Sequence, residues 1–475
     1  MNDHDRRRLA DLERRAEHDR TRSWPRHAAI DVRTYGAVGD GITNDTAAIQ
    51  AAIQAAGLGL VGGFVLFPAG VYRLTGTLVI DTEGVWLIGD GLVTVRLTMD
   101  AAAGVDAVQF TGVVGPPSGI RHIEINRGIG GTAVGAAVRI TNSNAVYLEH
   151  VWVNGFQDGI LWSGCGDCFA EHTYVELCSR FGYHMTDSAP MHLIDCRTYQ
   201  NLWGFYITGR RTVTGTSHHY VTSLIGCAAV EDVNGGFYVN DYLDVELIAP
   251  SVSSRDAQAP IQGITVSASE RIVIDAPKVA HAKQFGIWIT GASKYVDISN
   301  MQVDAVGHFS PVPAVTMWGV LVEATAQYIN IIGGSISNCY GGGLYMAATG
   351  QVVGVNIIDT GLNNNVIQGI DALVCATINA DTLGTLQVIG CTLRNTGPRG
   401  VGLSVPTGGY VRLIANRVSG FITNYSNLAT GNVKTVANSF SAGPNVGAAA
   451  TDLATVIALA NNLRTVLIEQ SMAQT

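Results

Sequence analysis

Acidic side chains crowd the stretch from residue 147 to residue 246, and paired carboxylates are groups that can perform acid–base chemistry. Glycoside hydrolysis needs two of them, one held protonated as the acid and one ionised as the base or nucleophile. Four acids in this stretch are spaced so that a repeating chain could bring them together, and we predict that they form the acid–base set: Glu176, Asp195, Glu231 and Asp232. The alternative for each is a solvated turn carboxylate, because exposed acids are common.

Aromatic residues crowd the same stretch, although they make up only 7% of the chain. Aromatic faces suit sugar rings, and side chains fixed on a rigid sheet lose little entropy on binding. The alternative is that many of these rings stack inside the fold. From this group we predict that Trp152, Tyr199 and Trp203 bind substrate.

The segment GRRTVTGTSHHY, residues 209 to 220, has the composition of a projecting insertion. Arg210 and Arg211 could hold the carboxylate of an acidic sugar in bidentate fashion, with His218 and His219 beside them. A lyase needs this neutralisation before a base removes the proton next to the carboxylate. Adjacent loop histidines are more often surface residues than metal ligands, so we predict no metal site and no cofactor.

A short repeated phrase, glycine followed by a bulky apolar residue, indicates the elements that would position these side chains. Successive copies are 22 to 33 residues apart, which is typical of a solenoid with variable insertions. Short β-branched strands bounded by turn residues predict an all-β, right-handed parallel β-helix. The copies are Gly159-Ile160, Gly182-Tyr183, Gly204-Phe205, Gly236-Phe237, Gly263-Ile264, Gly286-Ile287, Gly319-Val320, Gly343-Leu344, Gly369-Ile370 and Gly402-Leu403.

The cysteines follow a second pattern. The segments LEHVWV, VELCSR, LIDCRT, LIGCAA and VIGCTL predict one buried interior column without disulfides. The members of that column would be Val151, Cys178, Cys196, Cys227 and Cys391. Cys165 and Cys168 form a C-x-x-C pair, but no second pair at zinc spacing accompanies them, so we expect free thiols.

The stretch YGAVGDGITNDTAAIQAAIQAA, residues 35 to 56, predicts a cap for one end of the solenoid. Asn44 and Asp45 stand where a helix should begin, because short polar side chains accept the amide hydrogens of a first turn. A helix from about Asp45 to Ala56 would cover the unpaired edge of the first coil. No lysine follows the glycines, so the segment is a poor match to a phosphate-binding loop.

This stretch, together with GGFVLFPAGVYRLTGTLVI (62 to 80) and GVWLIGDG (84 to 91), resembles the opening of the pectate-lyase superfamily of β-helix proteins. That superfamily includes phage tailspikes, polysaccharide lyases and glycoside hydrolases. The resemblance covers about residues 31 to 91 and, through the looser repeat, extends to about residue 440. It implies that Asp40 and Asp45 serve turns and caps. The expected organisation is a charged helix at 1–26, the cap at 27–91, the solenoid body at 92–440 and an apolar-striped helix at 441–475.

The terminal segments and the net charge of the chain indicate which binding partners to expect. Leu453, Val456, Ala460, Leu463 and Leu467 form an apolar stripe that would either pack on the last coil or meet copies of itself. The net charge of −9 argues against nucleic acid, and no stretch is long and apolar enough to cross a membrane. The charged N-terminus is not a signal peptide.

The resemblance implies a tailspike-like protein that binds and degrades a bacterial surface polysaccharide, as a homotrimer attached to a phage tail or baseplate. One alternative is a receptor-binding or structural tail protein without activity. Another is a free bacterial polysaccharide lyase or glycoside hydrolase. We expect the virion tail as the location, because an exported enzyme would carry a signal peptide. The choice between lyase and hydrolase stays open at this point.

Overall fold

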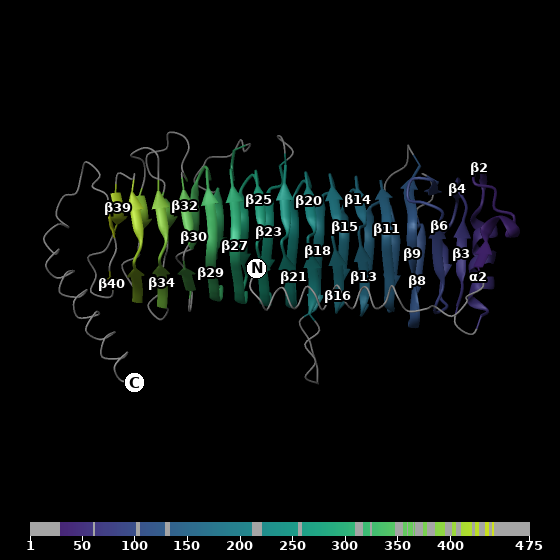
Figure 1. Cartoon of the computed structure of the whole chain (residues 1–475), viewed down its shortest axis with the longest axis horizontal. Helices are drawn as coiled ribbons and strands as arrows, with labels where there is room; N and C mark the ends of the chain where they lie inside the picture. The colour runs from purple at the N-terminus through teal and green to yellow at the C-terminus, as the bar shows by residue number, and fades with distance from the viewer. Residues whose placement is uncertain are drawn as a thin grey trace, which may run out of the picture.

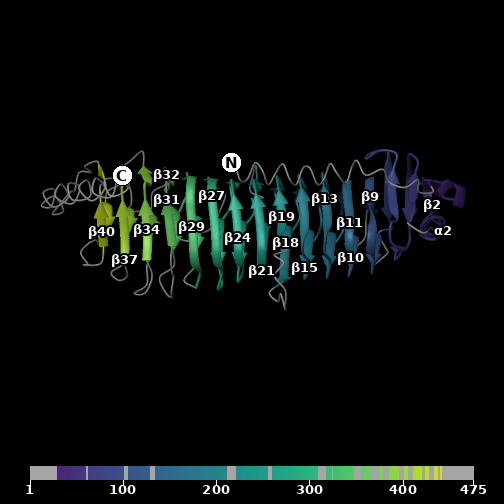
Figure 2. The same cartoon turned by 60° about the horizontal axis from the view of Figure 1, so that its bottom comes forward.

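The structure, a computed structural model, describes residues 29–440 with internal gaps. The gaps are 60–61, 101–104, 129–133, 211–220, 255–258, 309–316, 324, 347–354, 359, 364, 366–373, 378–384, 395–400, 405–409, 420–422, 427–432 and 437–438. The described strands stack along one long axis, and the same single stack appears after rotation (Figures 1 and 2). Successive coils pair in parallel, which confirms the predicted right-handed parallel β-helix.

Each coil presents three outer surfaces, which we call faces A1, A2 and B. The long strands β9 (Val114–Arg127), β11 (Asn144–Asn154), β27 (Lys294–Asp304) and β29 (Gln327–Ser337) run from A1 across a corner into A2. The strand β21 (Gly235–Ile248) runs from B into A1.

The remaining strands each lie on one face. Face A1 contains β1 (Ala29–Asp31), β3 (Phe64–Phe67), β6 (Trp86–Gly89), β13 (Cys168–Glu171), β16 (Met191–Ile194), β19 (Thr222–Ile225), β24 (Glu270–Asp275), β31 (Val355–Ile358), β34 (Thr385–Ile389), β37 (Tyr410–Ile414) and β40 (Val433–Val436). Face A2 contains β2 (Asp40–Asn44), β4 (Gly70–Leu74), β7 (Val95–Met99), β14 (Tyr174–Glu176), β17 (Arg197–Tyr199), β20 (Ala228–Val230), β22 (Ser251–Ser253), β25 (Lys278–Ala280), β32 (Gly361–Asn363), β35 (Thr392–Arg394), β38 (Arg417–Ser419) and β41 (Ser439–Phe440). Face B contains β5 (Leu78–Ile80), β8 (Val108–Thr111), β10 (Ala136–Thr141), β12 (Asp158–Ser163), β15 (Phe181–Thr186), β18 (Trp203–Arg210), β23 (Gln262–Ser267), β26 (Phe285–Thr290), β28 (Trp318–Val322), β30 (Gly342–Met346), β33 (Val374–Thr377), β36 (Val401–Ser404) and β39 (Thr423–Ser426).

The repeated glycines stack in one column of face B because the solenoid is narrow there. A methyl group added at Gly263 would lie 2.5 Å from Val279 Cγ1 across the interior. The apolar residues that follow the glycines form the next column, pointing inward. One predicted copy is wrong: Ala376 of β33, and not Ile370, is level with Leu344 and Leu403 in the apolar column, and Gly369-Ile370 lies outside the described residues.

The cysteines occupy tight corners between faces. Cys178, Cys196, Cys227 and Cys391 are buried free thiols, as predicted. They do not form one column, however, because the pairing places Thr173, and not Cys178, level with Val151 and Cys196. Cys178 lies at the corner after β14, and the sequence alignment had matched it to the corner before that strand.

A common corner geometry explains this residue choice. The residue before each of the seven described cysteines has a positive φ, for example Asp195 at 49° and Gly226 at 65°. The thiol then donates back to the carbonyl two residues earlier, as Cys227 Sγ does to Ile225 O at 3.7 Å. Serine occupies other corners in the same way, with Ser188 Oγ donating to Thr186 O. The corner thus needs a small side chain that can donate a hydrogen bond.

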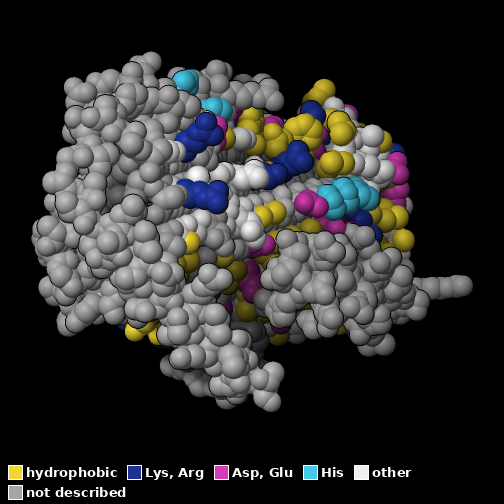
Figure 3. Space-filling view, turned by 60° about the vertical axis from the view of Figure 1, so that its left-hand side comes forward, with side chains coloured by type: hydrophobic (Ala, Val, Ile, Leu, Met, Phe, Trp, Pro, Cys, Tyr) yellow, Lys and Arg dark blue, Asp and Glu magenta, His cyan; other side chains and the backbone are white. Residues whose placement is uncertain are grey.

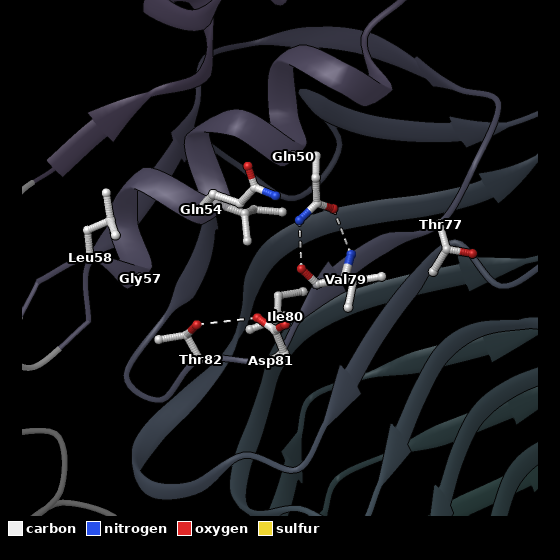
Figure 4. Close-up of a pocket in the computed structure, with 10 residues that line it drawn as sticks. Gln50, Gln54, Gly57, Leu58, Thr77, Val79, Ile80, Asp81 and Thr82 are labelled. Atoms are coloured by element: carbon white, nitrogen blue, oxygen red, sulfur yellow. Dashed lines mark hydrogen bonds between the residues drawn. The ribbon is translucent and has the colours of Figure 1, made fainter.

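The cap covers one end of the stack (Figure 1). The helix α2 (Thr46–Gly57) buries Ile49, Ala52, Ile53 and Ala56 against the first coils. The side-chain amide of Gln50 donates to Val79 O at 2.9 Å and accepts from Val79 N at 2.8 Å, which replaces a missing strand neighbour of β5 (Figure 4). This arrangement satisfies an otherwise open sheet edge.

The first coil of the solenoid includes strands that precede the capping helix. Winding begins before the helix, because β1 and β2 already pair with β3 and β4. A short 3₁₀ helix, η1 (Val32–Tyr35), joins β1 to the loop before β2. Asn44 Oδ1 accepts from Thr46 N as a helix cap, but the Asp45 carboxylate accepts from Val38 N at 2.7 Å and holds the preceding loop instead.

The predicted helices at the two ends of the chain, at 1–26 and 441–475, lie outside the described residues. Among the residues that the structure does describe, no helix is both long enough and apolar enough to span a bilayer.

Candidate active site at the corner between faces A1 and A2

The four predicted acids occupy three different environments. Asp232 is inside the solenoid, 1% exposed, where it accepts from Thr198 Oγ1 at 2.5 Å and from Asn201 N at 2.9 Å. Burial raises the pKa of Asp232 to about 7, against the opposing effect of these hydrogen bonds. A polysaccharide cannot reach this carboxyl group, so we remove Asp232 from the candidate set.

Glu176 and Glu231 lie near each other along face A2. Glu176 accepts from Asn154 Nδ2 at 2.6 Å and is level with Tyr199 on the next coil. Glu231 directly follows Val230, which is level with Tyr199 on the coil beyond, and accepts from Gln200 Nε2 at 3.0 Å. Two rungs, or about 10 Å, therefore separate the backbone at these two positions.

Asp195 lies at the corner between A1 and A2, and it is level with His172 and not with Glu176. The predicted binding residues also lie on different faces of the solenoid. Trp152 and Tyr199 are on face A2, while Trp203 is on face B, where its ring lies 5.0 Å from that of Tyr238.

The remaining predicted binding residues cannot be placed. Arg210 ends β18 on face B, but its side chain lies outside the described residues. Arg211, His218 and His219 also lie outside them.

The aromatic residues of this stretch divide between the interior and the surface. Trp162 and Tyr183 are fully buried and stack with Phe205 in the core. Trp152 and Tyr174 instead lie side by side on face A2, with ring centroids 5.7 Å apart. Both of the alternatives that the sequence left open for the aromatic group therefore occur.

Histidine side chains line the A1–A2 corner. His122, His150 and His172 follow one another on successive coils, with ring centroids 5.1 and 5.0 Å apart, and Asp195 takes the next position. All four backbones have positive φ angles between 49° and 56°. A corner of this shape directs consecutive side chains outward in a row.

His172 lies between two carboxylates. Its Nδ1 is 3.4 Å from Glu171 Oε1, and its Nε2 is 3.6 Å from Asp195 Oδ2. The side chains of His172 and Asp195 are 44% and 57% exposed, so both reach solvent. A histidine held by one acid and facing a second is suited to proton transfer, because the carboxylates stabilise the imidazolium that forms.

His150, on the preceding coil, packs against the ring of His172. Burial lowers the pKa of His150, and repulsion from His172 and His122 lowers that pKa further. His150 is therefore neutral near pH 7, and its ring stacks at 15° on that of His172 without adding a competing charge.

The A2 side of the corner adds a phenol and a guanidinium. Tyr174 lies two residues after His172, and Arg197 stands level with Tyr174 on the next coil. Burial and the neighbouring Glu176 raise the pKa of Tyr174, which keeps its hydroxyl protonated. Arg197 is exposed and forms no ion pair with any residue that the structure describes. We call His172, Tyr174, Asp195 and Arg197 the corner site.

Sequence reasoning selected Asp195 but missed the other three members. The signal was present, because the alignment of LEHVWV with LIDCRT also places His150 and Asp195 in register. On the face seen in Figure 3, the described basic, acidic, histidine and hydrophobic side chains lie interspersed on the surface. Within the described part of the chain, no group of three or more acidic, histidine or cysteine residues has the arrangement of a metal site.

Comparisons with known proteins agree with this architecture. Residues 29–118 match the family model described as rhamnogalacturonase A/epimerase, pectate lyase-like. A stretch of 71 residues is 56% identical to mannuronan C5-epimerase AlgE1 of Azotobacter vinelandii, covering 14% of this chain and 5% of that protein. Another of 44 residues is 61% identical to plasmin and fibronectin-binding protein A of Streptococcus pneumoniae, covering 9% and 6%. The chain thus spans only a small part of these relatives.

Solved structures extend the likeness over most of the chain. Tailspike protein 3 of bacteriophage CBA120 aligns with a TM-score of 0.53 at 11% identity, covering 88% of this chain and 62% of that one. The tailspike protein of E. coli bacteriophage HK620 aligns with a TM-score of 0.53 at 11% identity, covering 86% and 78%. At such identities the likeness concerns the fold. The chain therefore carries a pectate-lyase-like N-terminal region and has the right-handed parallel β-helix fold of these tailspikes.

Proposed function

We propose that the chain is a tailspike-like protein that binds and cuts an acidic bacterial surface polysaccharide at the corner site. The observation that carries the proposal is the position of His172, exposed to solvent between Glu171 and Asp195. Trp152 and Tyr174 beside it, with ring planes tilted at 58° to each other, offer the apolar surface that a sugar ring needs.

The arrangement favours β-elimination. In the neutral imidazole, Nδ1–H points to Glu171, which leaves the Nε2 lone pair to accept a proton. Arg197 pairs with the carboxylate of a uronate unit and stabilises the negative charge that develops when the adjacent C5–H is broken. His172 Nε2 accepts that proton, and Asp195 stabilises the resulting imidazolium.

The bond changes then balance without a further reactant. The C5–H electron pair forms the C4=C5 double bond, and the C4–O bond to the neighbouring sugar breaks. Tyr174, which its raised pKa keeps protonated, donates the proton to the leaving oxygen. The products are one new reducing end and one unsaturated uronate.

A second candidate, hydrolysis, is favoured by Glu176 and Glu231. Their positions two rungs apart on face A2 leave room for a water molecule between an acid and a base, as inverting glycosidases require. Tyr199, on the rung between them, would contact the sugar. Hydrolysis gives a reducing end but no unsaturated product, so the two candidates differ in a measurable way.

We also propose assembly into a homotrimer that attaches to a phage tail. The apolar stripe of Leu453, Val456, Ala460, Leu463 and Leu467 supports self-association, because a single helix in water would leave it exposed. The tailspike folds of CBA120 and HK620 are compatible with this location.

The test is to incubate the purified chain with panels of capsular polysaccharides and exopolysaccharides, both acidic and neutral. Reducing ends and ultraviolet absorbance of unsaturated uronates are followed together. Elimination predicts that both rise on an acidic polysaccharide. Reducing ends without absorbance would favour the Glu176 and Glu231 candidate, and no product from a broad panel would favour a binding-only protein.

A further inference from the structure

Face A2 carries a second exposed cation in addition to Arg197 of the corner site. Lys278 is the first residue of β25, and its side chain is exposed, as is that of Arg197. Within the described part of the chain, neither side chain forms an ion pair. Two fixed positive charges on one face attract anions, because no carboxylate of the described chain neutralises them.

The outward arginines on the earlier coils of face A2 are neutralised by acids. Arg73 Nη2 lies 2.7 Å from Asp100 Oδ2, and Arg96 Nη2 lies 3.1 Å from Glu124 Oε2. The unpaired positive charge of this face therefore lies at the corner site and on the coils beyond it.

The acids around Lys278 are held by other side chains. Asp275, three residues before Lys278, accepts from Ser299 Oγ at 2.6 Å. Asp304, on face A2 one coil beyond, accepts from Asn338 Nδ2 at 2.7 Å. The ammonium group of Lys278 thus stays available to an external carboxylate.

Strand pairing places Arg197 and Lys278 in one outward column. Arg197 is level with Ala228 on the next coil, and Ala228 is level with Ser251 on the coil after that. Ser251 is in turn level with Lys278, so three rungs, or about 14 Å, separate the two cations. A single sugar unit is shorter than this distance, so a ligand that contacts both must be a polymer.

Short side chains form the surface between the two cations. Ala228 and Ser251 are uncharged and do not reach as far from the sheet as arginine or lysine. The adjoining corner positions hold Gly226 and Ala249, both with positive φ. Gly226 also leaves room for the corner site, because a methyl group there would lie 2.4 Å from Asp195 Oδ1. A polysaccharide can therefore lie against the sheet along this column.

We infer that Lys278 is a second carboxylate subsite, which binds a further uronate unit of the polysaccharide that Arg197 holds. The polymer then runs parallel to the solenoid axis across successive coils. A lysine suits this role, because its compact charge on a flexible stem accepts a carboxylate in more than one orientation.

The direction of the polymer rests on the proposed function. Tyr174, which protonates the leaving oxygen, lies one coil before Arg197. The C4–O bond that breaks is on the non-reducing side of the uronate held by Arg197. The reducing end of the polymer therefore points toward Lys278, and the fragment that carries the new double bond lies over this column.

The experiment is calorimetric titration of full-length H172Q with oligomers of galacturonate, mannuronate and hyaluronan, from disaccharides upward. Affinity for at least one acidic series should rise at the length that first reaches from Arg197 to Lys278. K278Q in the H172Q background should lose this gain, about fivefold, which is the most that one exposed ion pair contributes. About 1 M sodium chloride should remove the gain as well, because it screens exposed charges.

K294Q in the same background is the matched control. Lys294 begins β27 on face A1, level with Glu270, so this variant removes one positive charge away from the column. Three results would overturn the inference: no acidic oligomer binds, K278Q keeps the gain with length, or K294Q loses it equally.

Failure of the proposed function has a separate readout. Unsaturated-uronate absorbance is followed with the parent, and with K278Q in the parent background, where the unsaturated products should shift to shorter lengths. If the parent forms no such product while the K278Q-sensitive gain in affinity remains, the elimination is wrong and the subsite stands.

Discussion

His172 Nε2 lies 3.6 Å from Asp195 Oδ2, across one coil of the solenoid and 23 residues apart in sequence. Stacking of coils is what brings them together, since each occupies the same corner position of its own coil. The chemistry of the corner site therefore depends on the register of the coils.

Asp232 should make stability depend on pH. Its folded pKa of about 7 lies above the unfolded value of about 4, so the folded state binds this proton more tightly. The stabilisation of the folded state by this proton is complete below pH 4 and is lost as pH rises through 7. Above pH 7 the loss in unfolding free energy is on the order of 4 kcal/mol. Replacing Asp232 with Asn keeps acceptors and donors for Thr198 and Asn201 but removes the titration.

The measurement is denaturant unfolding of the parent and of Asp232→Asn between pH 4 and 8. The difference in unfolding free energy should grow with pH in favour of the variant. If both proteins show the same pH dependence, Asp232 does not titrate in this window.

The corner cysteines should tolerate serine and reject valine. In Cys227→Ser the hydroxyl can still donate to Ile225 O, whereas Cys227→Val leaves that bond unmade and adds a branched carbon in the core. We expect a loss of about 1–3 kcal/mol for valine and a smaller change for serine, by thermal melting. A valine variant as stable as the parent would contradict the corner geometry.

Gln50 should be important for the cap. Gln50→Ala leaves the Val79 amide and carbonyl without their partners, at a cost of about 1–3 kcal/mol, and reopens the edge of β5. Gln54→Ala is the control. Gln50 and Gln54 of α2 line one pocket together with Val79 (Figure 4), but only Gln50 is hydrogen-bonded to the Val79 backbone. Melting and light scattering should show lower stability and more association for Gln50→Ala alone.

Self-association should depend on the apolar stripe of residues 453–467. Light scattering of the full chain at micromolar concentration should give a trimer mass, and removal of 441–475 should reduce it to that of a monomer. A monomer mass for the full chain would instead indicate that the stripe packs on its own solenoid.

The sequence was most informative at positions where a single physical requirement dictates the residue type. Glycine at 263 is required by contact with Val279, so the glycine column could be recognised from its period. The same logic failed at Gly369-Ile370, because the register places Ala376, and not Ile370, level with Leu344 and Leu403. Cys178 was assigned to the wrong corner because both corners select the same small donors.

The candidate site was harder to predict because a shift of one residue along the chain changes a side chain from exposed to buried. Glu231 and Asp232 are adjacent, yet the corner turns Asp232 into the core. His172 escaped notice because histidine is common in loops, and only its coil-by-coil alignment with His150 and Asp195 distinguishes it. The register between coils decides which side chains are exposed together, and amino-acid composition carries no information about that register.

The most direct test of the account compares H172Q with H308Q on an acidic polysaccharide that the parent cuts. His308 is exposed after β27, away from the corner site, so H308Q controls for loss of an imidazole. Initial rates of unsaturated-uronate formation should fall by about 10² to 10⁴ in H172Q and stay at the parent rate in H308Q, with equal melting temperatures for all three proteins. Cleavage by H172Q at the parent rate would contradict the assignment of His172 as the base.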